Sequence, residues 1–341
     1  MIRVHAIGES GDNYQLHDVA HVRLYLPLQL LAYEKQIKLS TGITYKGYED
    51  NDVFLLQRTW SRYLNTNSVE QLIRMIRSGK KKLIYEIDDN LLDIPNISSS
   101  SKMVICCLAK NADTVIVSTP DLKKRMEHIN KNIRVIPNYL DSRLIETRRG
   151  VFEKSKTITI GYMGTLTHQS DFQMIKLPLM RILQRFQSNV RFELLGAIND
   201  ESTIQSLPNT KIVDRSGISD YFSFWRCMNE NCFWDIGIAP LKYNEFTRCK
   251  SDIKYLDYSA LGMAGIYSRH PAYINTVKHR ETGMLVENNC EAWKTALEEL
   301  ICDERLRNTI RSSAQNDLWE NRILQSNIGL WLETINETYD S

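Results

Sequence analysis

The feature that most constrains the fold is an alternation of short β-branched runs with longer helical patterns along almost the whole chain. In one helical pattern, Val69, Leu72, Ile73 and Ile76 recur at positions i, i+3, i+4 and i+7, which places them on one helix face. Strands that alternate with helices are typical of a parallel sheet covered by helices. The sequence therefore predicts a doubly wound α/β protein.

The strand-like runs form two series, separated by the charged segment Asn138–Lys156. The first series is Ile2–Ile7, Val53–Gln57, Leu83–Ile87, Thr114–Ser118 and Ile133–Ile136. The second is Thr157–Tyr162, Arg191–Gly196, Lys211–Val213, Asp235–Ala239 and Gly265–Ser268. A turn with a short strand is expected within His279–Asn289, and a helical pattern runs from about Ala314 to Glu337 after it. Two sheets are favoured over one very wide sheet. The predicted domains are 1–150 and 151–318, followed by a terminal helix, 319–341.

Composition excludes several classes of protein. The 43 basic and 41 acidic residues nearly balance, and no basic stripe is interleaved with aromatics, which disfavours nucleic-acid binding. Seven cysteines at irregular spacings fit a reducing cytosol better than a disulfide framework, and none has zinc spacing. The polar N-terminus is not a secretory signal, and no apolar run approaches the ~20 residues of a membrane span. We expect a cytoplasmic protein, soluble or peripherally attached to the inner face of the membrane.

The densest candidate for a binding site is "FTRCKSDIKYLDYSALG", residues 246–262. Ser251 is a predicted helix N-cap, so Lys250 would lie beside a helix start that favours a phosphate. Lys254 and Asp257 are three residues apart and can face the same side, where Asp257 could accept a hydrogen bond from a ribose hydroxyl. The alternative is an amphipathic helix with solvated charges.

A second candidate is "GYMGTLTHQSD", residues 161–171, which follows a strand and lets a ligand approach the backbone at its glycines. Gly164, Thr165 and His168 are the predicted ligand contacts. The run is neither a GxGxxG nor a P-loop. Alternatively, Asp171 caps a helix and His168 lies at the surface.

The third candidate is "YEIDDN", in which the carboxylates of Asp88 and Asp89 end a strand. With Asn90 they offer oxygen ligands that suit Mg²⁺ or Mn²⁺. They could instead form a catalytic or acceptor-binding pair, or cap a helix, although capping needs only one carboxylate. Arg23 and Arg58, near other strand ends or loops, are candidates for binding an acceptor or are surface arginines.

Read in order, these turns resemble family-4 retaining glycosyltransferases of the GT-B fold, of the bacterial polysaccharide and O-antigen type. The runs that carry the resemblance are "YEIDDNL", "ADTVIVSTPDLKKRM", "RVIPNYLD", "GYMGTLTHQSDF", "FELLGA", "DIGIAPLKYNEFTRCKSDIKYLDYSALG" and "ETGMLVEN". The resemblance implies two Rossmann-like domains facing across a cleft, with a nucleotide-sugar held mainly by the second. The terminal helix, with Trp319 and Trp331, would pack back on the first.

The activity that the resemblance implies is transfer of a sugar from a nucleotide diphosphate to a glycan or lipid-linked glycan, with retention and without a metal or further cofactor. A metal at the aspartate pair would suit the GT-A type, which has no use for a second α/β sheet. The expected site residues are catalytic Asp88, Asp89 and Lys250; donor-binding Gly164, Thr165, His168, Lys250, Ser251, Lys254 and Asp257; and acceptor-binding Arg23 and Arg58.

The sequence departs from the family pattern in two places. The family's Glu-x7-Glu signature falls on Cys249 and Asp257, and no Arg or Lys follows Gly164 closely. These departures keep a non-catalytic module as one alternative, and a nucleotide-sugar epimerase of the same two-domain shape is another. Basic residues that could rest on anionic lipid, or could simply be solvated, are Arg74, Arg77, Lys80, Lys81, Lys82, Lys123, Lys124 and Arg125.

Overall fold

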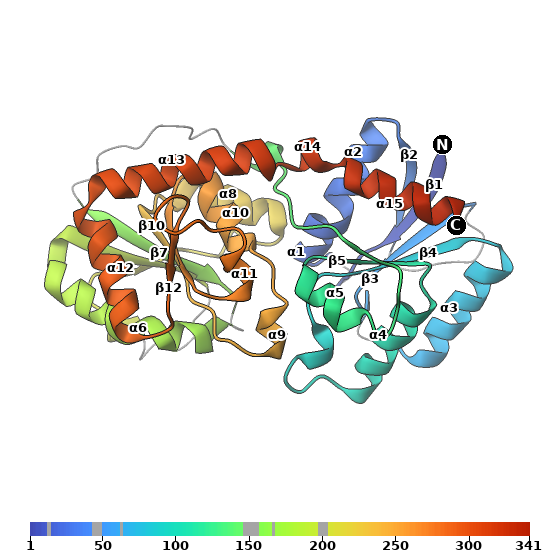
Figure 1. Ribbon diagram of the computed structural model, residues 1–341, viewed down its shortest axis with the longest axis horizontal. Coiled ribbons are helices and arrows are strands. Elements are labelled where there is room, and N and C mark those ends of the chain that lie inside the picture. The colour runs from blue at the N-terminus through green and yellow to red at the C-terminus, as the bar shows by residue number, and fades with distance from the viewer. Residues whose placement is uncertain (12–14, 43–49, 62–63, 146–156, 166–167, 197–203) are drawn as a thin grey trace. The chain divides into compact units, whose positions relative to one another are not determined.

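The computed structural model describes residues 1–11, 15–42, 50–61, 64–145, 157–165, 168–196 and 204–341. The chain divides into two compact units (Figure 1). The first unit comprises Met1–Asp141, Arg248–Ser251 and Leu324–Ser341, and the second comprises Ser142–Thr247 and Asp252–Ile323. The predicted domain boundary at 150 lies outside the described residues.

The described strands of the first unit form one six-stranded parallel sheet in the order β2-β1-β3-β4-β5-β6. Its strands are β1 (Ile2–Ile7), β2 (Ile37–Gly42), β3 (Val53–Gln57), β4 (Lys82–Ile87), β5 (Thr114–Val117) and β6 (Ile133–Val135). Its helices are α1 (Asp18–Ala20), α2 (Leu26–Tyr33), α3 (Thr66–Ser78), α4 (Ser99–Asn111), α5 (Pro120–Met126), α14 (Leu324–Asn327) and α15 (Gly329–Asp340). Helices α3, α4 and α5 cover one face, and α2 and α15 cover the other (Figure 1).

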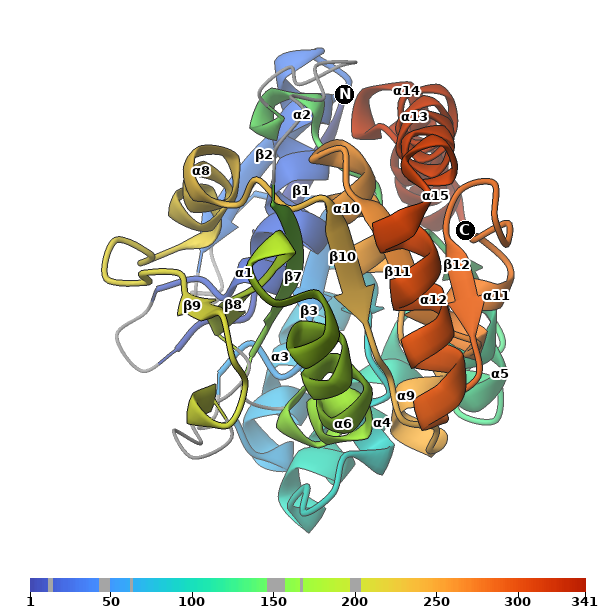
Figure 2. The ribbon, with the colours of Figure 1, turned by 90° about the vertical axis from the view of Figure 1, so that its left-hand side faces the viewer.

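The second unit also has a six-stranded parallel sheet among its described residues, in the order β12-β11-β10-β7-β8-β9. Its strands are β7 (Ile158–Gly164), β8 (Val190–Gly196), β9 (Thr210–Ile212), β10 (Ile236–Ala239), β11 (Ala264–Ser268) and β12 (Met284–Val286). Its helices are α6 (Gln169–Phe186), α8 (Tyr221–Asn231), α9 (Glu245–Arg248, whose last residue joins the first unit), α10 (Ile253–Ala260), α11 (Pro271–Ile274), α12 (Cys290–Cys302) and α13 (Glu304–Asn321). Helices α6 and α12 pack on one face and α10 and α13 on the other (Figure 2).

The doubly wound α/β prediction is confirmed, and each predicted strand has a counterpart within two residues at either end. Strand β2 was not predicted. It lies at the sheet edge, and most of its side chains are partly or fully exposed, so it lacks the apolar run of an inner strand.

The predicted single terminal helix is wrong, because the structure breaks it into α13, α14 and α15. Before the break, the Arg322 guanidinium donates to both oxygens of Asp252 (2.7 and 2.9 Å) in the second unit. After it, the backbone N–H of Leu324 donates to the carbonyl of Leu140 (2.9 Å) in the first. Trp331 is buried in the first unit as expected, whereas Trp319 belongs to the second.

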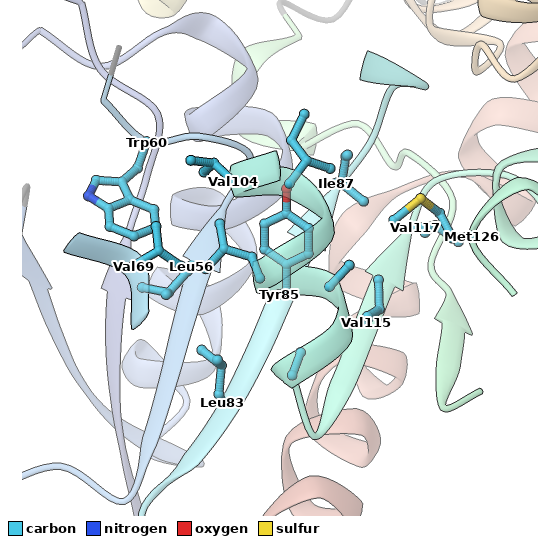
Figure 3. Packing of buried hydrophobic residues seen from close by; sticks show 14 of the residues in the cluster. Leu56, Trp60, Val69, Leu83, Tyr85, Ile87, Val104, Val115, Val117 and Met126 are labelled. Carbon is cyan, nitrogen blue, oxygen red and sulfur yellow. The ribbon is translucent and has the colours of Figure 1, made fainter. Parts of the chain in front are cut away.

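The core of the first unit is an apolar cluster between its sheet and helices α3 to α5. Figure 3 shows part of it, with the Tyr85 ring close to Leu56 and Val104. The Tyr85 hydroxyl is buried and makes no hydrogen bond with the described residues. Cys249 belongs to the same cluster and is 3% exposed. The residue at the first position of the Glu-x7-Glu signature therefore packs in a core.

Candidate functional site

Each sheet has a switch point, a pair of neighbouring strands from which the connections run in opposite directions along the sheet. Ligands of open α/β sheets bind at the carboxyl ends of the strands at this point. In the first sheet this point lies between β1 and β3, and in the second between β7 and β10. The turns that follow these strands are therefore the natural places to search for a site.

At this edge of the first sheet, the Arg58 guanidinium binds three carboxylates. It donates from Nε to Asp88 (2.6 Å), from Nη1 to Glu9 (3.0 Å) and from Nη2 to Asp89 (3.3 Å). Glu9 follows β1, Arg58 follows β3 and the aspartates follow β4. The Arg58 backbone is left-handed (φ +47°), a conformation that non-glycine residues seldom adopt and that is common at functional sites. We call Glu9, His17, Arg58, Asp88, Asp89 and Lys250 the Arg58 cluster.

The charges of this cluster stabilise one another. Burial opposes ionisation of Asp88, but the charge and hydrogen bond of Arg58 outweigh it and lower the pKa of Asp88. Burial also disfavours the guanidinium, yet the three carboxylates raise the pKa of Arg58 well above its ordinary value. Hydrogen bonding with Glu9 raises the pKa of His17, whose Nδ1 lies 3.5 Å from that carboxylate. The cluster therefore holds ionised carboxylates at the sheet edge.

Lys250 joins the cluster from the segment 248–251, with Nζ 3.6 Å from Asp89 Oδ2. The whole segment belongs to the first unit, although the residues on either side belong to the second. Its other anchors are Arg248 with Asp121 (3.3 Å), the Cys249 carbonyl with the Thr119 hydroxyl (2.9 Å) and the Ser251 hydroxyl with the Asn138 amide (2.7 Å).

The prediction that Ser251 caps a helix is wrong. Helix α10 begins at Ile253, its N-cap is Asp252, and no side chain caps it. Asp252 instead binds Arg322 and the Thr276 hydroxyl (2.7 Å). The Ser251 hydroxyl is bound by Asn138 because its segment packs on the first unit.

Arg23 lies in the interior rather than at the surface, with a side chain that is 2% exposed. It donates to Glu86 (2.8 Å), to the Ile136 carbonyl (2.8 Å) and to Asn138 (3.0 Å), and its guanidinium lies 5.9 Å from the Trp331 ring centroid. The prediction that Arg23 contacts an acceptor finds no support in this geometry, because burial leaves no surface for contact.

Neither aspartate of the pair caps a helix. The short turn after them, Leu91–Asp93, has Asn90 at its N-cap without a side-chain cap, and the Asn90 amide donates to Asp93 (2.7 Å). In the part of the chain that the structure describes, no three His, Cys, Asp or Glu side chains are grouped so as to hold a metal ion. Arg58 bonds both carboxylates and lies where a cation would bind them.

At the switch point of the second sheet, the structure brings together His168 from the β7–α6 turn and Lys254 from α10. His168 Nε2 lies 3.5 Å from Lys254 Nζ, and Nδ1 lies 2.9 Å from Asp171 Oδ2. Asp171 Oδ1 accepts the backbone N–H of Lys242, in the loop after β10, at 2.8 Å. Gly164 is the last residue of β7, and Thr165 follows it just before this turn.

Asp257, one turn along α10 from Lys254, has an unusual environment. The residue is 8% exposed, and no described residue donates a hydrogen bond to its carboxylate. Burial raises its pKa to about 7, against a smaller opposing effect of the Lys254 charge. A buried carboxylate without a donor is costly unless a ligand or water supplies one.

Sequence reasoning missed Glu9, His17 and Asp171 as parts of these sites. Position offered a weak signal for Glu9, which comes two residues after β1 at the switch point. The sequence indicates Asp171 only as a helix cap, but it lies inside α6, and its carboxylate joins two loops.

Comparisons with known proteins give the fold. No protein-family model and no curated protein sequence matches the chain. Among solved structures, sucrose-phosphate synthase from Thermosynechococcus elongatus is similar over 100% of both chains, with 12% identity and a TM-score of 0.73. HepE from Anabaena, in complex with UDP and glucose, is similar over 99% of this chain and 100% of its own, with 13% identity and a TM-score of 0.68.

The chain has the GT-B fold. A third similar structure is that of a protein from Listeria monocytogenes that is provisionally described as a UDP-N-acetylglucosamine 2-epimerase. It matches 99% of this chain and 97% of its own, with 10% identity and a TM-score of 0.61.

Two further surface features bear on the sequence predictions. Within the described residues, no helix is long and apolar enough to cross a membrane. In the basic clusters, Arg77 binds Asp113 (2.7 Å) and Arg125 binds Asp93 (2.7 Å), so part of their charge is neutralised within the chain.

Proposed function

We propose that this protein is a glycosyltransferase that moves a sugar from a nucleotide diphosphate to a glycan or lipid-linked glycan, with retention and without a metal ion. The observation that carries the proposal is Asp257, a buried carboxylate without a hydrogen-bond donor beside Lys254 and His168. Ribose hydroxyls would supply the missing donors, and the Lys254 ammonium would bind the diphosphate. HepE, similar in fold over the full chain, binds UDP and UDP-glucose.

The Arg58 cluster is the proposed acceptor side. Asp88 and Asp89 are partly exposed, at 14% and 21% of their side chains, and can accept hydrogen bonds from acceptor hydroxyls. Because Arg58 lowers the pKa of Asp88, this carboxylate needs no metal ion to stay ionised. Lys250 lies beside Asp89, which supports a role with these carboxylates; its contact with the donor stays a prediction.

The reaction breaks the bond between the sugar C1 and the diphosphate oxygen, and the leaving diphosphate takes the electron pair. The acceptor oxygen forms the new bond to C1 on the same face, and its proton passes to a leaving-phosphate oxygen. Cations that hold the diphosphate stabilise the charge that accumulates there. Binding both substrates in the correct orientation supplies much of the remaining acceleration.

The proposal is tested by calorimetric titration with UDP, GDP and dTDP, each with and without EDTA. We expect one diphosphate to bind in the micromolar range, equally well with EDTA. Asp257→Ala should weaken that binding at least tenfold, whereas Asp214→Asn, which changes an exposed aspartate of the same unit, should leave it unchanged. Binding that requires Mn²⁺ and is lost in Asp88→Ala would instead support a metal site at the aspartate pair.

The similarity to the Listeria protein favours an epimerase as the second candidate. An epimerase consumes a nucleotide-sugar without a second substrate. Incubation of the bound nucleotide-sugar without an acceptor, followed by NMR of the sugar, distinguishes the two: an epimerised product supports this alternative. A glycosyltransferase leaves the configuration at every carbon other than C1 unchanged.

A further inference from the structure

The His168 ring has a polar partner at each nitrogen, and the two partners differ in kind. Nδ1 lies 2.9 Å from a carboxylate oxygen of Asp171, and Nε2 lies 3.5 Å from the ammonium nitrogen of Lys254. Asp171 is itself held, because it is 4% exposed and its other oxygen accepts the Lys242 N–H. One buried carboxylate thus fixes the ring and the loop after β10 together.

These partners determine where the ring proton lies. A carboxylate only accepts hydrogen bonds, so Nδ1 must carry a proton to bind Asp171. An ammonium only donates, so Nε2 must be unprotonated to accept from Lys254. A doubly protonated ring would place two cations 3.5 Å apart, which is unfavourable. The arrangement requires a neutral His168 with its proton on Nδ1, an assignment inferred from its partners.

The contact with His168 also restrains Lys254. A lysine carries its charge on a flexible four-carbon stem, and fixing that charge requires a partner near its end. Lys254 lies in the first turn of α10, one turn before Asp257, and the imidazole holds its ammonium near the β7–α6 turn. In the sequence no arginine or lysine lies between Gly164 and His168, so the cation near this turn comes from α10.

We propose that Asp171 is a positioning residue that, through the tautomer of His168, directs the Lys254 ammonium at the diphosphate of a nucleotide-sugar. The inference rests on the proposed function for its ligand, but the proton on Nδ1 exists without the ligand. Asp171 does not touch the nucleotide; it acts through His168 and by holding the Lys242 loop. This assigns Asp171, until now only a possible helix cap, to the donor site.

Asp171→Asn tests the tautomer with little change of shape. The backbone N–H of Lys242 cannot change its role, so the amide oxygen of the variant will face it, and the amide N–H will face His168 Nδ1. Nδ1 must then accept, and the proton moves to Nε2. The Nε2–H group then faces the Lys254 ammonium donor to donor, and the contact is lost.

The first measurement is ¹⁵N NMR of histidine-labelled protein at pH 8 without nucleotide, in which the two neutral tautomers have distinct ring signals. His168→Gln identifies the signals of His168 among the seven histidines. We expect the proton on Nδ1 in the wild type and on Nε2 in Asp171→Asn, with Asp214→Asn like the wild type. A proton on Nε2 in the wild type, or an unchanged tautomer in Asp171→Asn, would overturn the inference.

The second measurement is titration with UDP, GDP or dTDP, whichever binds, in a double-mutant cycle with Lys254→Met. When Lys254 is present, we expect Asp171→Asn to raise the Kd for the diphosphate about tenfold. When residue 254 is Met, the same substitution should leave that Kd unchanged. Equal weakening in both backgrounds would contradict the positioning role, because Asp171 would then act independently of Lys254. If no diphosphate binds while the tautomers change as expected, the proposed function and the diphosphate target are overturned, and the histidine contact is purely structural.

Discussion

In the first unit three carboxylates converge on the Arg58 guanidinium, whereas in the second the buried Asp257 carboxylate accepts no hydrogen bond from the described residues. The pKa values follow this difference, lowered at Asp88 by Arg58 and raised at Asp257 by burial. The protein itself stabilises the charges of the first site, so that site is formed without a ligand. The second has an unmet requirement for donors, which is the property expected of a ligand-binding carboxylate.

The largest change in the free energy of unfolding should come from removing Arg58, the cation that binds the three carboxylates of the first site. Arg58→Ala leaves three carboxylates close together without their cation, and we expect a loss of about 3–5 kcal/mol of unfolding free energy in urea titrations. Arg74→Ala, which removes an exposed pair with Glu70 (3.8 Å), should cost about 0.5 kcal/mol or less. Similar losses in the two variants would mean that the cluster is solvated like the surface pair.

The second-largest effect should come from Asp257 in the second site. Its substitution should raise the free energy of unfolding, whereas substitution of Arg58 lowers it. The pKa of Asp257 is about 7 in the folded protein against 3.8 ordinarily, so the folded state holds its proton longer than the unfolded state. Stability from this group is full below about pH 4 and is lost as the pH rises to about 7. At about 1.4 kcal/mol per pKa unit, a shift of about three units corresponds to a loss of about 4 kcal/mol at pH 8.

Asp257→Asn removes this titration. We therefore expect the variant to be more stable than the wild type at pH 8, with a smaller difference at pH 5, as measured by urea unfolding at both values. Saturating the wild type with the diphosphate that it binds should reduce the difference at pH 8, because the ligand supplies donors. A difference that does not change with pH would show that the carboxylate is not destabilised by burial.

The smallest change in stability is expected when the hydroxyl of a buried tyrosine is removed, and each unit offers one such tyrosine. Tyr85 in the first unit has a hydroxyl without a hydrogen bond, so Tyr85→Phe should leave stability unchanged or raise it by about 1 kcal/mol. Tyr258 in the second donates to the Ile238 carbonyl (2.8 Å), so Tyr258→Phe should cost about 1–2 kcal/mol. Thermal unfolding of both variants gives the comparison, and equal losses would indicate that Tyr85 has a partner, such as a buried water.

The fold was largely predictable because inner strands of parallel sheets are buried on both faces and read as short apolar runs, as in β3 and β10. Strand β2 was not, since an edge strand needs no such run. The break after α13 was missed because a helical pattern continues on both sides of it, and no local signal marks the passage of the chain to the first unit at Leu324.

The site was predictable in part. That Asp88 and Asp89 end a strand follows from the sequence; that they share Arg58 depends on the order β1-β3-β4, which no local pattern encodes. The burial of Arg23 had a detectable signal in Glu86, because a carboxylate within a buried strand requires a cation or donors nearby. Ser251 could not be predicted correctly, because a tertiary contact overrides its capping tendency.

The return of α15 to the first unit has a consequence for synthesis on the ribosome. The Thr338 hydroxyl hydrogen-bonds that of Thr114 in β5, 224 residues earlier in the chain. At elongation rates of about 5–20 residues per second, β5 is made roughly 10–45 s before its partner. During that interval the sheet face that α15 will cover is exposed in the nascent chain, while the second unit can already be folding. The unit made first is therefore completed last.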